Sequence, residues 1–190
     1  MIEENNLHPV HQCNDGLFNS ASGIKVDLLS PTADMISLHD IAKGLDNICR
    51  FGGQIKSRYT VCSHTLLVWY LAPVHLKEAA LLHDAAEAYI GDVIKPLKVI
   101  LEPIYGPIEA RFEAVIFGKY NVNIDLLKSI KPYDKRALEI EHAYFHRDDK
   151  ELIRKQYEIH EQLGVHNTYF ALLRLLSESF GAYEIGRVRP

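Results

Sequence analysis

From residue 38 onward, apolar residues recur three and four positions apart, the spacing that gathers them on one face of an α-helix. The first such stretch opens with Ser37 and Asp40, which have the spacing of a helix-capping box, and Pro73 and Gly91 end later ones. The expected helices cover residues 38–50, 60–71, 76–90, 104–119, 132–147, 149–163 and 168–180. Because proline disrupts a helix interior, the segment 92–98 around Pro96 is expected to be a turn or loop.

This pattern predicts an all-α protein with short connections. The chain has 190 residues, 47% hydrophobic and 24% charged, a globular composition sufficient for a single domain over residues 1–190. Only the first 35 residues depart from the helical pattern. A turn at residues 19–23 there suggests a small N-terminal hairpin.

Charge and apolar runs exclude several classes of partner. The net charge of −4 provides no overall attraction for nucleic acid or an anionic membrane. No apolar run reaches transmembrane length, and the acidic, polar start does not resemble a signal peptide. Cys13, Cys49 and Cys62 lack C-x-x-C spacing and are interpreted as reduced thiols. We therefore expect a cytoplasmic protein without nucleic-acid or membrane partners.

Ionisable residues interrupt three of the apolar faces. His64 lies on the face of helix 60–71, His83 and Asp84 follow an apolar run in helix 76–90, and Asp134 shares a face with Glu141 after Pro132. A buried, unpaired carboxylate is costly, so such groups must be paired, protonated or bound to metal. Imidazoles and carboxylates together suit a divalent transition metal.

Each residue also has an ordinary structural interpretation. A single histidine such as His64 is commonly a core residue bonded to a carbonyl, and Asp134 suits the first turn of a helix. Asp84 and Glu87 could pair with Arg or Lys. The His83-Asp84 pair inside an apolar run favours the metal site, because a surface ion pair does not require that setting.

Two further histidine motifs are weaker candidates. In His39-Asp40, the acid is already explained by the capping box. His142 and His146 have a workable i, i+4 ligand spacing, but they lie in a charged stretch and are interpreted as a solvated face.

The order His64, His83-Asp84, Asp134 resembles the H…HD…D signature of the HD-domain phosphohydrolases. Further blocks resemble the branch of small single-domain bacterial and phage nucleotide hydrolases, which includes 5′-deoxynucleotidases and phage dATP triphosphohydrolases. These blocks are D-I-A (40–42), C-R-F-G-G (49–53), Y-T-V-C-S-H (59–64), L-L-H-D-A-A-E-A-Y-I-G-D (81–92) and K-P-L-K (95–98). The domain core is then expected at residues 22–147, followed by C-terminal helices at 149–180. One departure is Gln54, where many relatives carry His.

The resemblance implies a divalent ion, Zn, Mn, Co or Fe, held by His64, His83, Asp84 and Asp134, with a second Mg or Co possible. Glu87, three residues after Asp84, is assigned to orient or deprotonate the attacking water.

Other residues are expected to act on the substrate. The resemblance makes Asp92 a second catalytic acid. Arg50, beside Gly52-Gly53, suits phosphate oxygens. Phe51 is either a stacking surface for a base or a core aromatic. In the K-P-L-K block, Lys98 and Lys95 should add positive charge for the polyphosphate, with Pro96 between them.

The chain has no glycine-rich phosphate loop, so the metal and basic side chains must handle the phosphate charge. The expected reaction converts dATP to deoxyadenosine and tripolyphosphate. A 5′-deoxynucleotidase acting on monophosphates is the alternative, and a catalytically degenerate nucleotide-binding domain is a second one. The resemblance also implies a homo-oligomer, in which the apolar segment 168–180 either completes the core or contacts another copy.

Overall fold

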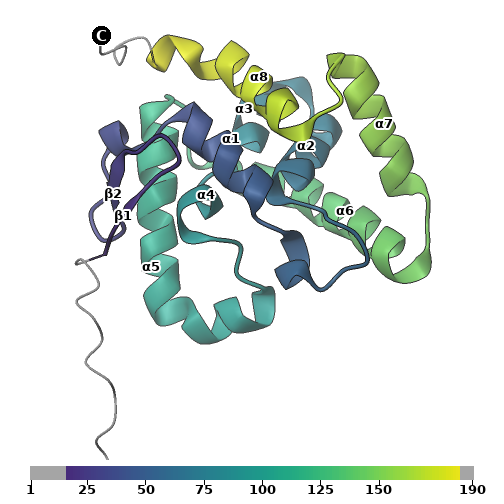
Figure 1. Ribbon diagram of the computed structural model, residues 1–190, viewed down its shortest axis with the longest axis horizontal. Coiled ribbons are helices and arrows are strands. Elements are labelled where there is room, and N and C mark those ends of the chain that lie inside the picture. The colour runs from purple at the N-terminus through teal and green to yellow at the C-terminus, as the bar shows by residue number, and fades with distance from the viewer. Residues whose placement is uncertain (1–15, 185–190) are drawn as a thin grey trace, which may run out of the picture.

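The computed structural model of the protein describes residues 16–184. These form an all-α domain with one small hairpin, which confirms the predicted fold class (Figure 1). In the hairpin, β1 (Leu17–Asn19) pairs antiparallel with β2 (Lys25–Asp27), and Phe18 lies opposite the buried Val26. Cys13 lies outside the described residues, whereas Cys49 is half-buried and Cys62 buried, both as free thiols.

The helices follow one another with short connections. They are α1 (Leu38–Asn47), α2 (Val61–Leu71), α3 (Lys77–Leu82), α4 (Glu87–Ile90), α5 (Lys95–Lys119), α6 (Leu126–Arg147), α7 (Glu151–Leu163) and α8 (Thr168–Phe180). Short 3-10 turns lie at Ala33–Met35, Arg50–Gly53, Val74–Leu76 and Gly181–Tyr183.

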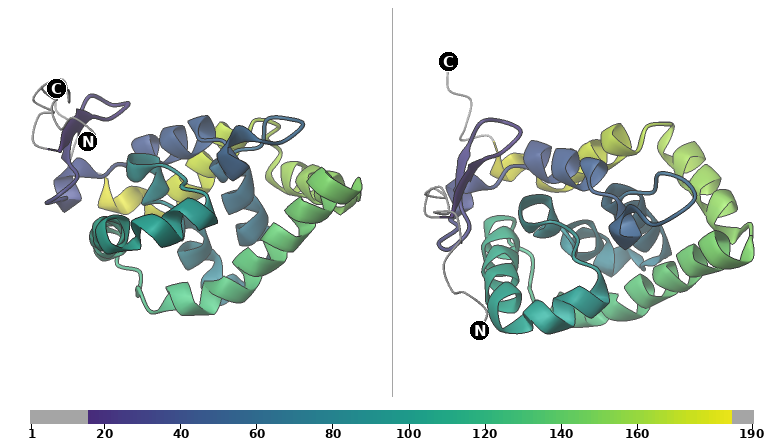
Figure 2. Two further views of the ribbon diagram at one scale, coloured as in Figure 1. Left: turned by 90° about the horizontal axis from the view of Figure 1, so that it is seen from below. Right: turned by 60° about the horizontal axis from the view of Figure 1, so that its bottom comes forward.

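Helix α2 is the centre of the domain, because residues 61–69 are all buried and the helix contacts α1, α3, α6, α7 and α8. The helical pair α6–α7 closes one side, and α5 with the hairpin lies on the other (Figures 1 and 2). A helix that is apolar on all sides belongs in such a core. His64 in α2 is therefore held at the middle of the molecule.

The N-terminus of α1 is capped differently from the prediction. Ser37 Oγ accepts the N–H of Asp40 at 3.1 Å, as expected. The Asp40 carboxylate, however, accepts from Ser20 Oγ at 2.8 Å and from the N–H and Oγ of Ser22 at 2.7 and 2.6 Å. The N–H of Ser37 instead donates to Tyr89 Oη at 3.1 Å. Asp40 thus ties the hairpin to α1 rather than completing a capping box.

The prediction of one continuous helix over residues 76–90 is wrong, because the segment forms two helices, α3 and α4. Between them the chain stays tightly turned through i→i+3 hydrogen bonds, from Ala85 N to Leu82 O and from Glu87 N to Asp84 O, both 3.0 Å. Such tightened turns are frequent at functional positions. His83 and Asp84 lie in this segment.

The predicted loop 92–98 is wrong in its second half, because α5 already begins at Lys95. Pro96 lies in its first turn, where a missing N–H costs nothing. Pro103 and Pro107 lie inside α5, which bends so that its first part runs across the direction of the second (Figures 1 and 2). Helix α6 likewise starts before Pro132.

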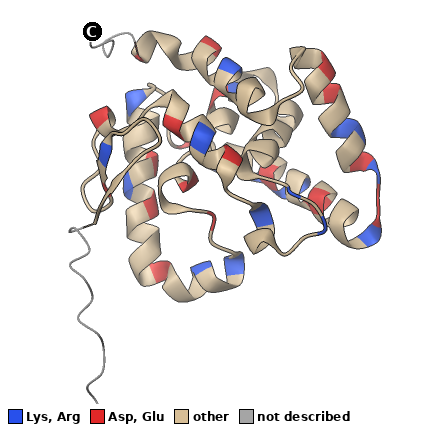
Figure 3. Cartoon of the chain, viewed as in Figure 1, with Lys and Arg blue, Asp and Glu red and all other residues tan. Residues whose placement is uncertain are grey.

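The C-terminal helix completes the core. In α8, Leu172, Leu175, Leu176 and Phe180 are buried against the rest of the domain. The homo-oligomer stays a prediction. Within residues 16–184, no helix combines the length and apolarity required to cross a membrane. Acidic and basic residues are interspersed along the helices (Figure 3), in keeping with the small net charge.

Candidate metal centre

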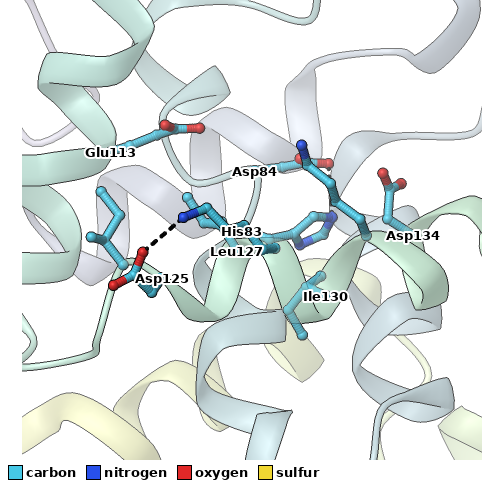
Figure 4. A pocket seen from close by; sticks show the side chains of 10 residues that line it. His83, Asp84, Glu113, Asp125, Leu127, Ile130 and Asp134 are labelled. Carbon is cyan, nitrogen blue, oxygen red and sulfur yellow. Dashed lines mark hydrogen bonds and ion pairs between the residues drawn. The ribbon is translucent and has the colours of Figure 1, made fainter.

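The four predicted metal ligands come together from three segments. His64 Nε2 lies 3.4 Å from His83 Nε2, 3.1 Å from Asp134 Oδ1 and 3.5 Å from Asp84 Oδ2. Asp84 Oδ2 is also 3.2 Å from His83 Nε2. Within the described residues, His64, His83 and Asp134 each offer a ligand atom within 4.8 Å of the others. Figure 4 shows His83, Asp84 and Asp134 directed towards a common point.

Hydrogen bonds on the far side of each imidazole set its orientation. His64 Nδ1 lies 2.6 Å from Glu141 Oε1, and His83 Nδ1 lies 2.8 Å from the carbonyl oxygen of Ala80. Because both partners are acceptors, each Nδ1 carries a hydrogen, and Nε2 is the atom that offers its lone pair to a metal once it is deprotonated. An acceptor on the second nitrogen is the usual arrangement for metal-binding histidines.

This donor set fits a divalent cation. Two imidazole lone pairs and two carboxylate oxygens face one another, which is repulsive unless a positive charge lies between them. Ligand atoms about 2.0–2.2 Å from one metal are separated by roughly 3.0–3.5 Å, as these atoms are. The residues present therefore suit a metal of the transition series with positions left for other ligands.

The electrostatics of the site favour positive charge. Burial lowers the pKa of His64, but Glu141 and the hydrogen bond with Asp134 outweigh it and raise that pKa to about 9. Burial raises the pKa of Asp84, but His83, His64 and Arg50 together hold it below its ordinary value. A site that stabilises an imidazolium proton this strongly also attracts a metal ion, which would replace that proton.

Glu87, the first residue of α4, lies beside this cluster with one oxygen unused. The residue is 8% exposed, and its buried Oε2 has no hydrogen-bond partner among the residues that the structure describes. Burial, reinforced by Asp84 and Asp92, raises the pKa of Glu87 well above its ordinary value. Asp92 follows Gly91, whose φ of 83° suits glycine. Burial raises the pKa of Asp92, an effect that Arg50 opposes.

Arg50 is a largely buried cation beside the cluster. Its Nη2 donates to Glu141 Oε2 at 3.2 Å, while its buried Nε has no hydrogen-bond partner within residues 16–184. Burial lowers the pKa of the guanidinium, but Glu141, Asp84, Asp92 and Glu87 more than compensate and raise it above its ordinary value. An uncommitted buried N–H on a permanent cation suits an anionic ligand.

Other predicted residues lie outside this cluster. Phe51 adopts φ 56° and is half-buried, with its ring edge-on to Phe145 and His142 of α6 at centroid distances of 5.8 and 5.2 Å. The guanidinium carbon of Arg50 lies 5.5 Å from the centroid of this ring, and a role in stacking on a base stays a prediction. Lys95 and Pro96 are exposed at the start of α5. Lys98 donates to Glu109 at 2.7 Å.

The two weaker histidine motifs lie outside the centre as well. His142 and His146 are exposed, as expected for a solvated face. The imidazole of His39 is half exposed, with Nδ1 3.6 Å from Asp40 Oδ1, while Asp40 itself serves the hairpin.

A cavity of about 400 Å³ opens from the ligands between α5 and α6 (Figure 4). Its lining residues are His83, Asp84, Glu113, Ile124, Asp125, Leu127, Lys128, Ile130, Lys131 and Asp134. Leu127 and Ile130 contribute to an apolar wall, and Glu113 faces the ligands across the cavity (Figure 4). Sequence reasoning missed this wall, because nothing local distinguishes its residues from an ordinary amphipathic helix.

The sequence analysis assigned no role to Glu141 or to Tyr59, although Tyr59 opens one of the blocks that carry the family resemblance. The position of Glu141 on the apolar face of its helix was the available signal. Its partners, His64 and Arg50, precede it by 77 and 91 residues, so their proximity could not be inferred from spacing.

Comparison with protein-family models finds no match. The chain is similar to uncharacterized protein YfdR of Escherichia coli (strain K12), 39% identical over 116 residues that cover 61% of this chain and 65% of the relative. It is also similar to uncharacterized protein RCAP_rcc00048 of Rhodobacter capsulatus, 37% identical over 125 residues that cover 61% of this chain and 64% of that protein. The chain thus spans slightly less than two thirds of each relative, and neither assigns it an activity.

Proposed function

We propose that the protein is a metal-dependent phosphohydrolase of the HD-domain type that acts on deoxynucleotides in the cytoplasm, with dATP as the preferred substrate. The observation that carries this proposal is the convergence of His64, His83, Asp84 and Asp134. Beside them lie two buried polar atoms, Glu87 Oε2 and Arg50 Nε, that have no hydrogen-bond partner in the described part of the chain. The preference for adenine and for the triphosphate rests on the sequence resemblance alone.

The residues of the site divide the chemistry among them. A divalent ion held by the two histidines and two aspartates would supply Lewis acidity towards phosphate and water. Arg50 is placed to donate Nε–H to a phosphate oxygen, with its guanidinium plane held by Glu141. Glu87 offers its free Oε2 to a hydrogen of the attacking water and orients it or accepts its proton.

The cavity between α5 and α6 is the proposed site for the nucleoside. Its volume of about 400 Å³ lies within the range of small-molecule pockets, roughly 300–1,000 Å³. Leu127 and Ile130 offer apolar surface to a sugar or base, and Glu113 offers a half-buried carboxylate to a hydroxyl or amino group. The proposed partner is accordingly a small molecule.

One observation favours the alternative, a 5′-deoxynucleotidase. Lys98 is paired with Glu109 at 2.7 Å, so its charge is partly neutralised within the protein. A triphosphate has more negative charge to stabilise than a monophosphate. If Lys98 stays with Glu109, less positive charge faces a triphosphate, although Lys128 and Lys131 also line the cavity.

Product analysis tests the proposal and separates the alternatives. The protein is incubated with each of the four dNTPs and four dNMPs and with Co²⁺, Mn²⁺ or Mg²⁺, and products are resolved by anion-exchange chromatography. Tripolyphosphate from dATP, absent with the His83→Ala variant, is the expected result. Inorganic phosphate from monophosphates alone would transfer the assignment to the 5′-deoxynucleotidase. Metal binding without turnover of any nucleotide would contradict both and indicate another substrate class. A protein that holds no metal and is inert with every divalent ion would favour the catalytically degenerate nucleotide-binding domain.

A further inference from the structure

Glu141 of α6 lies at the junction of three segments and is fully buried, with 0% of its surface exposed. Its Oε1 lies 2.6 Å from His64 Nδ1 and accepts from Tyr59 Oη at 3.1 Å. Its Oε2 accepts from Arg50 Nη2 at 3.2 Å. One carboxylate therefore contacts both a metal-binding histidine and the arginine assigned to phosphate.

We propose that Glu141 is a positioning residue that orients His64 and Arg50 together, so that one side chain governs both cation binding and anion binding at this site. That the anion is a nucleotide phosphate rests on the proposed function. The contacts of Glu141 with His64 and Arg50 are independent of it. Glu141 acts through these two residues and touches neither the metal nor the substrate.

The chemistry of the three contacts explains why a carboxylate is required. All three neighbours present hydrogens, and only a carboxylate offers acceptors on both of its oxygens. Glutamine keeps the shape but places an NH2 group against either Arg50, where it meets another donor, or His64. In the second case Nδ1 must accept, which puts the hydrogen of the neutral ring on Nε2, the atom that would bind the metal. Because Tyr59, His64 and Glu141 are buried, a hydrogen that loses its acceptor here is costly to leave unpaired.

The Arg50–Glu141 ion pair is largely buried, so the loss of either partner is costly. The side chain of Arg50 is 13% exposed and that of Glu141 is 0% exposed, so the pair is largely removed from solvent. A buried charge that loses its partner is strongly disfavoured and tends to move. Without Glu141, Arg50 would turn towards the remaining carboxylates, and the His64 ring would lose the bond that sets its tautomer.

Binding measurements without turnover test this inference. Isothermal titration calorimetry with Mn²⁺ measures the affinity for the cation. Titration of the Mn²⁺-saturated protein with inorganic phosphate measures the affinity for the anion. For Glu141→Gln we expect Mn²⁺ affinity to fall about 10- to 100-fold and phosphate affinity to fall as well, even at saturating Mn²⁺. In the Co²⁺-loaded protein, the visible absorption bands should also shift, because the His64 ring is no longer held.

Two variants provide matched comparisons. Glu139→Gln removes the same charge from the same helix, but the side chain of Glu139 is 52% exposed and pairs with Arg136 at 3.6 Å, away from the metal ligands, so both affinities should stay unchanged. Tyr59→Phe removes one donor to Glu141 but leaves the contacts of Glu141 with His64 and Arg50, so both affinities should change less than in Glu141→Gln. If Glu141→Gln fails to fold, Glu141→Asp retains the charge but withdraws the carboxylate by one methylene, and the same two losses are expected.

The outcomes separate the inference from the proposed function. Unchanged Mn²⁺ and phosphate affinities in folded Glu141→Gln would overturn the inference. A loss of Mn²⁺ affinity with unchanged phosphate affinity would overturn it as well. A wild-type protein that binds Mn²⁺ and phosphate but hydrolyses no nucleotide would contradict the proposed function only, and the two affinities would still decide the role of Glu141.

Discussion

Lys98 and Glu109 form an ion pair at 2.7 Å although both belong to α5 and lie eleven positions apart. In a straight helix that separation is about 16 Å along the axis, too far for the two side chains to meet. The bend associated with Pro103 and Pro107 brings them together. The geometry of this one helix therefore determines whether a predicted substrate cation is available.

Breaking the ion pair between Lys98 and Glu109 should change KM for a triphosphate substrate more than KM for a monophosphate. In Glu109→Gln the ammonium loses its anionic partner, so we expect KM for dATP to fall roughly threefold, with little change for dAMP, because a half-exposed charge is screened. Steady-state kinetics on both substrates measure this. Lys98→Ala is the converse and should raise KM for dATP. Equal effects on both nucleotides would show that Lys98 does not contact the distal phosphates.

Removing the proposed base should separate catalysis from metal binding. Glu87→Gln keeps the size of the side chain but cannot accept a proton, so kcat should fall about 10²- to 10⁴-fold, while Mn²⁺ affinity stays near the wild-type value. Kinetics and titration calorimetry provide the two readouts. Glu78→Gln, an exposed acid on α3, is the control. A kcat within threefold of wild type in Glu87→Gln would refute the assignment.

The contact between α1 and α4 depends on Gly44. A Cβ there would lie 2.7 Å from Ala88 O and 2.8 Å from Ala88 Cβ, distances that force the helices apart. Because Ala88 follows Glu87, Gly44→Ala should lower kcat and reduce the free energy of unfolding by about 1–3 kcal/mol. Urea unfolding and kinetics measure these effects.

The matched comparison is Gly118→Ala on an exposed face of α5, where an added Cβ meets no atom within 4 Å. Replacing a helical glycine by alanine should there be neutral or stabilising by up to about 1 kcal/mol. Equal destabilisation by both substitutions would show that the close approach to Ala88 is unimportant.

The attachment of the hairpin should weaken in acid. Burial raises the pKa of Asp40, but hydrogen bonds from Ser22, Ser20 and Ser37 more than offset it and hold the pKa below 3.8, its ordinary value. A carboxyl whose pKa is lower in the folded state stabilises that state above the unfolded pKa, and this contribution is lost as pH falls through the folded value.

Asp40→Asn should therefore cost about 1.5–3 kcal/mol at pH 7, the range for hydrogen bonds to charged groups, and progressively less below about pH 4. Urea unfolding of both proteins at pH 7, 5 and 3 measures the difference. Asp148→Asn is the control, since that side chain is 78% exposed and its backbone φ of 55° suits Asn. A cost for Asp40→Asn that is independent of pH would contradict this account.

The sequence predicted the helical class and the candidate ligands because both leave local signals. Apolar residues at helical spacing mark α2 and α8, and His64, Asp84 and Asp134 stand out as ionisable groups on apolar faces. Each signal lies within a single helix, where neighbouring positions have a known geometry. The hairpin was marked in the same way by its turn residues.

The helix bounds were predicted wrongly at a proline and at a tight turn, because each is compatible with more than one local structure. Pro96 suggested a loop, but in the first turn of α5 it interrupts no hydrogen bond. The segment around His83 and Asp84 keeps helical dihedrals yet bonds i→i+3, a choice that packing makes and composition does not reveal.

By itself, then, the sequence determined which faces are apolar, where the main helices lie and which ionisable residues those faces carry. Only the tertiary structure decided that Arg50 and His64 share Glu141, that Lys98 pairs with Glu109, and that Phe51 packs on α6. The physical reason is that periodicity specifies the direction of a side chain from its own helix, whereas its partners depend on how distant helices pack together.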